Sequence, residues 1–296
     1  MPLTSDPHRP TAPAQPDAGR LYSLVETLRQ RAPLIHCLSN TVVENFVANV
    51  LLALGAAPAM VVDAGEAAEF APVADALSIN LGTLTEPQAV AMRAAVQAAN
   101  AAGRPWVLDP VAVGHLSLRT RFAHELLAVA PAIIRGNASE IIALAGAAGG
   151  GRCVESTARS EAALPAAIAL ARARGAVVAL TGETDYVTDG ERVAGFANGD
   201  PVMQRVTGVG CALSATCAAF VGICSDRWLA ACAAVAYTGV CGQLAARAHD
   251  VTPSAQAGPD AVSRPARPGS FMPSYLDWLA GLGQDDFLRL LRPADA

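Results

Sequence analysis

Short apolar runs alternate with amphipathic or alanine-rich stretches along most of the chain from residue 34 onward. The apolar runs predict buried strands, because each is brief and ends at or beside a polar residue or glycine. They are PLIHC (33–37), APAMVV (57–62), ALSIN (76–80), PWVLDP (105–110), AIIRG (132–136) and AVVALTG (176–182). The stretches between them predict helices at 42–54, 65–74, 86–102, 117–130, 137–146 and 161–174. Such alternation predicts an α/β fold, with a mostly parallel central sheet and helices on both faces.

The pattern changes once, near residue 185. DYVTDGERVAGF (185–196) has a Thr-Asp-Gly turn between two β-rich arms and predicts an antiparallel hairpin at the sheet edge. Long apolar helices follow at 210–223 and 227–248, then a Pro/Gly/Ala-rich loop at 251–270 and a last helix at 273–292. We find no repeat of fixed period, so we expect a single domain over 21–296 after a disordered tail at 1–20.

Composition and charge exclude several classes of protein. Of the 296 residues, 52% are hydrophobic and 16% charged, and the net charge of −5 comes without a basic stripe, so a nucleic-acid partner is not expected. The N-terminus has no apolar core, and the apolar stretches 47–62 and 206–224 are too short or too interrupted to span a membrane. The 7 cysteines include no zinc-like spacing, which favours a reducing, cytoplasmic location.

Polar residues gather where the predicted strands end. Ligands of parallel sheets bind beyond the carboxyl ends of the strands, so these residues form a candidate ring. Its members are Ser39-Asn40, Asp63, Asn80, Asp109, Arg135-Gly136-Asn137 and Thr181-Gly182.

Two acidic positions in this ring are candidates for holding Mg²⁺. Asp109 ends a buried strand before Pro110, although a carboxylate there also serves as a helix cap or turn residue. Asn137 and Glu140 lie three apart at the start of a helix, which taken alone is typical of a capping box. The alternative is that Glu140 orders Mg²⁺ while Arg135 meets a nucleotide phosphate.

A glycine-rich turn precedes the helix that begins near residue 210. Thr207-Gly208-Val209-Gly210-Cys211 leads directly into apolar sequence. Converging N–H groups and the helix dipole would make an anion hole there, although the same pattern fits a tight turn before a buried helix. Thr181 similarly either faces a phosphate or marks a simple turn. Only the combination of these motifs, in this order, is specific.

Residues 33–292 resemble hydroxyethylthiazole kinase, the thiamine-salvage member of the ribokinase-like family. The resemblance rests on LIHCLSNTVVENFVANVLLALGAAPAMV, LDPVAVG, IRGNASE, VTDG and GVGCALSA, which follow one another in family order. It implies a three-layer ribokinase-like sandwich, ATP-dependent phosphorylation of the thiazole alcohol, Mg²⁺ as cofactor, and a homotrimer with active sites at the subunit interfaces.

The resemblance also implies roles for single residues. Asp109, Glu140 and Asn137 match the magnesium positions, and Arg135 and Thr181 match the ATP-contacting ones. Met60, Asn40 and Gly208 match the thiazole pocket. Cys211 stands where most ribokinase-like enzymes have the aspartate base of the G-x-G-D motif, and Gly208 and Gly210 form its anion hole. The sequence departs from the family at Val209, where threonine is usual, and at Arg267, where glycine is usual.

A cysteine at a helix N-terminus is expected to have a lowered pKa, so Cys211 would orient or partly deprotonate the alcohol. The alternatives are another ribokinase-like alcohol kinase, such as one for hydroxymethylpyrimidine, a hydrolase with Cys211 as nucleophile, and a binding protein that has lost catalysis. The folded part of the chain holds His36, His115, His124 and His249, but none lies in a nucleophile–base motif.

Overall fold

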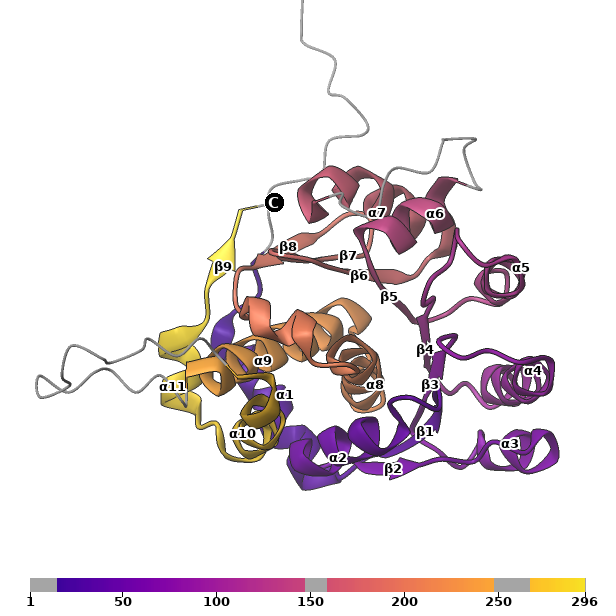
Figure 1. Cartoon of the computed structure of the whole chain (residues 1–296), viewed down its shortest axis with the longest axis horizontal. Coiled ribbons are helices and arrows are strands. Elements are labelled where there is room, and N and C mark those ends of the chain that lie inside the picture. The colour runs from indigo at the N-terminus through magenta and orange to yellow at the C-terminus, as the bar shows by residue number, and fades with distance from the viewer. Residues whose placement is uncertain (1–14, 147–158, 248–266, 296) are drawn as a thin grey trace, which may run out of the picture.

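The computed structural model describes residues 15–146, 159–247 and 267–295. Within these residues the strands form one sheet of nine, in the order β2-β1-β3-β4-β5-β6-β7-β8-β9 (Figure 1). The strands are β1 (Leu34–Leu38), β2 (Ala57–Ala59), β3 (Ala76–Asn80), β4 (Trp106–Asp109), β5 (Ile133–Asn137), β6 (Val177–Thr181), β7 (Asp185–Thr188), β8 (Val193–Phe196) and β9 (Pro293–Ala294). The pairs from β2 to β6 are parallel and those from β6 to β9 antiparallel. The predicted mostly parallel sheet is confirmed.

Helices cover both faces of this sheet and complete three layers. They are α1 (Ala18–Arg31), α2 (Glu44–Leu54), α3 (Ala64–Phe70), α4 (Glu86–Ala101), α5 (Ser117–Leu127), α6 (Ala138–Gly146), α7 (Ser160–Arg174), α8 (Val209–Val221), α9 (Arg227–Arg247), α10 (Pro268–Gly281) and α11 (Gln284–Leu290). One hydrophobic core lies under α3 to α7, and a second unites the opposite sheet face with α1, α2 and α8 to α11. Figure 1 shows the sheet curving around α8 and α9, with α3 to α7 outside.

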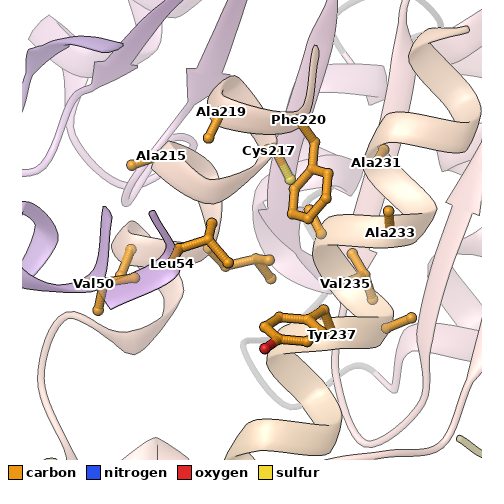
Figure 2. Packing of buried hydrophobic residues seen from close by; sticks show 14 of the residues in the cluster. Val50, Leu54, Ala215, Cys217, Ala219, Phe220, Ala231, Ala233, Val235 and Tyr237 are labelled. Carbon is orange, nitrogen blue, oxygen red and sulfur yellow. The ribbon is translucent and has the colours of Figure 1, made fainter. Parts of the chain in front are cut away.

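The centre of the second core is the contact between α8 and α9. Figure 2 shows Cys217 and Phe220 on the side of α8 that faces α9, where they pack among buried residues of α9 such as Ala231 and Val235. By length and composition, α9 is apolar enough to cross a membrane, although it is not one of the two apolar stretches that the sequence pattern indicated. However, 94% of the 18-residue apolar stretch of this helix is buried inside the protein, as expected of a core helix.

The structure differs from the sequence prediction mainly at the two ends of the chain. Helix α1 begins at Ala18, inside the expected tail, because the Asp17 side chain caps it by accepting from the Arg20 N–H. Residues 1–14, and most of the loop expected at 251–270, lie outside the described residues. The single last helix is two helices, α10 and α11, followed by β9. Because β9 pairs with β8, the predicted hairpin is confirmed but is not the edge of the sheet.

The strand predicted at 57–62 is also shorter than expected. Strand β2 ends at Ala59 and lies at the edge of the sheet, where Pro58 is tolerated because one side of the strand needs no N–H donor. Met60 therefore lies in the loop that follows β2, at the carboxyl edge of the sheet.

Candidate active site

Polar side chains at the carboxyl ends of β1, β3 and β4 form a continuous hydrogen-bonded chain. Asn80 and Asp109 are register partners at the ends of β3 and β4, and Asn80 Nδ2 donates to Asp109 Oδ2 at 2.6 Å. Asn40, just beyond the end of β1, donates from Nδ2 to Asn80 Oδ1 at 2.9 Å. The expected convergence of strand ends is confirmed for these three residues. Asp63 is the exception, since it is exposed and accepts from Gly65 N and Glu66 N to cap α3.

Asp109 is the most deeply buried charged residue of this cluster. Its side chain points to the α8 face, as does Val107 two positions earlier, because side chains alternate along a strand. Ser214 on α8 donates to Asp109 Oδ2 at 2.8 Å, whereas Oδ1 has no hydrogen-bond partner in the described part of the chain. Burial raises the pKa of Asp109 to about 7, Arg135 opposes this rise, and the nearby Glu140 adds to it. These contacts are not those of a helix cap or a turn.

The glycine-rich turn places the start of α8 against this cluster. Gly208 is the N-cap, with φ 94°, and a Cβ there would lie 2.9 Å from both Phe46 Cδ1 and Val43 Cγ1. A glycine N-cap supplies no side-chain acceptor, so the first N–H groups of α8 receive no side-chain cap. The two interpretations of this turn are therefore compatible: it is a tight turn before a buried helix, and it is suited to bind an anion.

Arg135 crosses in front of this helix N-terminus. A Cβ on Gly210 would lie 2.7 Å from Arg135 Nη1, so only glycine permits this approach. Arg135 Nη2 donates to Thr181 Oγ1 at 2.7 Å, while Nε has no partner in the described residues. Burial acts to lower the pKa of Arg135, but the charges of Asp109 and Glu140 outweigh it and raise the pKa. The expected pair of Arg135 and Thr181 is brought together.

Asn137 and Glu140 form the capping box that their spacing predicts. Asn137 Oδ1 accepts from Glu140 N at 3.0 Å, and Glu140 Oε2 accepts from Asn137 N at 2.9 Å. Glu140 Oε1 accepts from Ala112 N at 3.0 Å, which ties the loop after β4 to α6. Glu140 nevertheless lies near the site, since its charge contributes to the raised pKa of Asp109. Capping and a place beside Asp109 are thus compatible.

Cys211 lies half-buried in the first turn of α8, next to Asn40. Asn40 Nδ2 approaches Cys211 Sγ at 3.5 Å. The expectation of a lowered pKa is wrong: burial and the charge of Asp109 raise the pKa of Cys211 to about 11, in spite of the helix N-terminus. At neutral pH the side chain is a thiol, which favours an orienting role over that of a base or nucleophile.

Met60 is half-buried and packs against the core on the α8 face. The adjoining Val61 carbonyl is held by His36 Nε2 at 2.8 Å, which fixes the loop that carries Met60. This hydrogen bond and an edge-on contact with Phe70 hold the His36 ring on the face of β1 opposite to α8. No hydrogen bond joins His36 to Cys211. The described residues include no group of three His, Cys, Asp or Glu side chains suited to a metal.

Sequence reasoning assigned no role to two residues that hold this site together. Asn80 was in the candidate ring, but without a function, and Ser214 was not singled out at all. Ser214 follows Gly210 by four residues, so it lies on the same face of α8 one turn further along, and that helical spacing was the available signal.

Comparisons with known proteins show which family this chain belongs to. The model of the hydroxyethylthiazole kinase family matches residues 25–285. The hydroxyethylthiazole kinase of Klebsiella pneumoniae (strain 342) is 58% identical over 252 residues, which cover 85% of this chain and 91% of that protein. The hydroxyethylthiazole kinase of Escherichia coli (strain K12) is 52% identical over 256 residues, covering 86% and 92%.

Solved structures share the fold. The hydroxyethylthiazole kinase protein from Pyrococcus horikoshii OT3 superposes with a TM-score of 0.82 at 33% identity, covering 93% of this chain and 98% of that one. Pyridoxal kinase from Staphylococcus aureus has a TM-score of 0.53 at 16% identity, covering 71% and 87%, and shows likeness of fold alone. The α/β sandwich expected from the sequence is confirmed by both. With matches of this extent and identity, the chain belongs to the hydroxyethylthiazole kinase family.

Proposed function

We propose that this protein transfers the γ-phosphoryl group of ATP to the primary hydroxyl of 4-methyl-5-(2-hydroxyethyl)thiazole, a step of thiamine salvage. The observation that carries the proposal is the buried Asp109, whose Oδ1 has no partner among the described residues although Arg135 and the α8 N-terminus lie nearby. A carboxylate next to an anion hole and an arginine is the arrangement that phosphoryl transfer uses.

The acceptor alcohol would bind among Asn40, Met60, Gly208 and Cys211. These residues come from the ends of β1 and β2 and from the start of α8, which lie together at the carboxyl edge of the sheet. With its pKa raised to about 11, Cys211 stays protonated at neutral pH and orients the hydroxyl by hydrogen bonding. Phosphoryl transfer depends mainly on positioning and charge, so a strong base is not required.

The phosphates of ATP would lie over the N-terminus of α8. The first N–H groups of this helix and its dipole favour an anion, and Gly208 and Gly210 keep the approach free of side chains. Arg135 supplies a positive charge and an unpartnered Nε at the same place, and Thr181 fixes its guanidinium. Arg135 and Thr181 therefore serve as the nucleotide contacts.

The donor set also fits Mg²⁺. This ion is usually held by one or two carboxylates together with substrate phosphates and water, not by a full protein cage. Asp109 offers the orphaned Oδ1, Glu140 lies close enough to influence the pKa of Asp109, and Asn137 holds Glu140 in place. Bound there, the ion would neutralise charge on the transferring phosphoryl group.

We further propose a homotrimer whose subunit interfaces contribute to the sites. Three large apolar side chains on or next to α2 and β2 are exposed, Val42 at 63%, Leu52 at 59% and Val62 at 51%. A second copy of the chain would cover them and enclose the thiazole. Light scattering tests this, since a monomer mass at assay concentrations contradicts a shared site. The free cysteines among the described residues agree with a cytoplasmic enzyme.

The direct test of the reaction is a substrate comparison. Purified protein is incubated with ATP and Mg²⁺ and either the thiazole alcohol or hydroxymethylpyrimidine, and the products are identified by mass. We expect the thiazole phosphate at a rate well above that of the pyrimidine phosphate. Preference for the pyrimidine would move the proposal to another alcohol kinase, and an acyl adduct on Cys211 would favour the hydrolase.

A further inference from the structure

The amide of Asn80 is held by three hydrogen bonds inside the protein. Its Oδ1 accepts from Asn40 Nδ2 at 2.9 Å and from Gly82 N at 2.9 Å, while its Nδ2 donates to Asp109 Oδ2 at 2.6 Å. The side chain is 3% exposed. A flipped amide would face two N–H donors with its own NH₂ group, so this network permits a single orientation.

On the acceptor side, that orientation determines how Asn40 presents its amide. Asn40 Oδ1 accepts from Val42 N at 3.1 Å, and one proton of its Nδ2 is taken by Asn80. The other side of Nδ2 is directed towards Cys211 Sγ, at 3.5 Å. The bond to Asn80 therefore aligns Asn40 with the place proposed for the alcohol.

On the phosphate side, the same amide determines which oxygen of Asp109 is free. Asn80 Nδ2 and Ser214 Oγ both donate to Oδ2, at 2.6 and 2.8 Å. Oδ1 is left without a partner among the described residues. Two donors on one oxygen prevent the carboxylate from rotating, so Oδ1 points in a fixed direction.

The backbone around Asn80 leaves little room for another arrangement. A Cβ on Gly82 would lie 2.5 Å from Asn40 Nδ2, so the loop after β3 packs directly on the Asn40 amide. Asn80 and Asp109 are also register partners in the sheet. Sheet pairing therefore holds Asn80 against Asp109, and the packing of this loop holds the Asn40 amide in place.

We propose that Asn80 is a positioning residue that links the acceptor-alcohol side of the active site to its phosphate side. Through one amide it aligns Asn40 towards Cys211 and, with Ser214, fixes Asp109 so that only Oδ1 faces the reacting phosphate. This rests on the proposed kinase function and adds two residues to its machinery. Neither Asn80 nor Ser214 touches the reactants.

The test separates the two sides with matched variants. Asn80→Ala removes both links, and Ser214→Ala removes only the phosphate-side link. Asn80→Asp keeps the acceptor for Asn40 and Gly82 but replaces the amide donor to Asp109 by a carboxyl group that shares one proton with the Asp109 carboxylate, so it disturbs the phosphate side alone. Thr216→Val is the control, because Thr216 is equally buried on α8 and, within the part of the chain that the structure describes, its hydroxyl bonds only to Ala212 O in its own helix. Each variant is measured for kcat with ATP and Mg²⁺, for Kd of the thiazole alcohol by calorimetry without nucleotide or metal, and for melting temperature.

We expect Asn80→Ala to lower kcat by about 10- to 100-fold and to weaken thiazole binding by about 2- to 10-fold, the value of one hydrogen bond. Ser214→Ala and Asn80→Asp lower kcat and leave Kd unchanged, and Thr216→Val changes neither. Should Asn80→Ala fail to fold, the split between kcat and Kd in the other two variants decides the question.

The proposal is overturned if Asn80→Ala lowers the melting temperature while kcat and Kd stay at wild-type values, since that describes packing alone. It is equally overturned if Ser214→Ala weakens thiazole binding as much as Asn80→Ala does. The wild type separates these failures from that of the proposed function. If the wild type transfers no phosphate to the thiazole, the kinase function fails and this inference with it, whereas an active wild type confines the failure to Asn80.

Discussion

The clusters around Arg192 and Arg135 differ in how many of the hydrogen-bond donors of the arginine have a partner. Arg192, at the turn between β7 and β8, bonds Asp189 Oδ2 through Nε at 2.7 Å. Its Nη1 and Nη2 both bond the carboxylate of Asp226 at 3.1 Å, and its guanidinium lies 4.4 Å from the centre of the Trp228 ring. This cluster joins the hairpin to the start of α9 and has little capacity left for a ligand.

Arg135 has the opposite character. It donates to Thr181 Oγ1, and among the described residues its Nε has no partner. It makes no hydrogen bond to Asp109 or Glu140, two of the carboxylates whose charges raise its pKa. Those carboxylates, Asp109 and Glu140, are held by other donors. The group is therefore oriented by its surroundings but incompletely paired.

The difference teaches how to separate a structural ion cluster from a catalytic one. Buried polar groups are nearly always satisfied in folded proteins, so the lack of partners for Asp109 Oδ1 and Arg135 Nε among the described residues needs a reason. Held next to a helix N-terminus, these two atoms are ready to meet a charged ligand. The Arg192 cluster, on the surface and saturated, requires no such explanation.

Among the substitutions that test this comparison, we expect the largest effect on kcat at Asp109. Asp109→Asn keeps the shape but removes the negative charge, and loss of one preorganised electrostatic partner typically lowers kcat by about 10²- to 10³-fold. The melting temperature stays the same or rises, because an incompletely paired buried charge is removed. Retained turnover in this variant would show that Asp109 is structural, like the Arg192 cluster.

Glu140 is predicted to have the next largest effect. Glu140→Gln preserves one acceptor of the capping box and loses the charge beside Asp109, so we expect kcat to fall about 10- to 100-fold. The cost to unfolding free energy is about 1 kcal/mol, the usual value of a cap. Urea titration and steady-state kinetics measure the two quantities. A loss of about 1 kcal/mol with unchanged kcat would mean that the capping box is the only role of Glu140.

A smaller effect is expected at Cys211, because its raised pKa leaves it protonated. Cys211→Ala lowers kcat by about 2- to 10-fold, the value of a single neutral hydrogen bond, and Cys211→Ser restores most of that loss. The pH profile of kcat between pH 6 and 9 has the same shape in both variants as in the wild type. A rising limb present only in the wild type would instead identify the thiolate as a base.

The smallest effect concerns stability and pH in the absence of ligands. The pKa of Asp109 is raised from 3.8 to about 7 in the folded protein, so the folded state holds this proton more tightly than the unfolded state. The contribution of Asp109 to stability is therefore present below about pH 4 and is lost as pH rises through 7. The melting temperature of the wild type relative to Asp109→Asn should fall over that interval and level off above it. A constant difference would mean that Asp109 titrates normally.

The sequence predicted those features of the fold and site that follow from hydrophobic periodicity and from polar residues at strand ends. Apolar alternation located β1 to β6 and most helices, and the rule that ligands bind at carboxyl strand ends brought Asn40, Asn80 and Asp109 into one ring. It did not reveal that β9 extends the sheet beyond β8, because that pairing joins segments almost a hundred residues apart.

Burial and hydrogen-bond occupancy were the properties that the sequence could not supply. The direction of the Cys211 pKa was wrong because a helix N-terminus is visible in the sequence while desolvation is not. The role of Ser214 depends on a contact across 105 positions with Asp109. Asp63 and Asp109 both follow apolar runs, yet only tertiary packing makes one a cap and the other a buried acid.

The most direct test replaces each arginine with glutamine and measures kcat/KM for ATP and melting temperature side by side. Arg135→Gln is predicted to lower kcat/KM by about 10- to 100-fold, in line with the 1.5–3 kcal/mol typical of a hydrogen bond to a charged group, with little change in melting temperature. Arg192→Gln is predicted to leave kcat/KM unchanged and to lower the melting temperature by about 2 °C, as loss of a surface ion cluster does. The reverse result, with Arg135→Gln active but unstable and Arg192→Gln stable but inactive, would contradict the assignment of the Arg135 cluster as the catalytic centre.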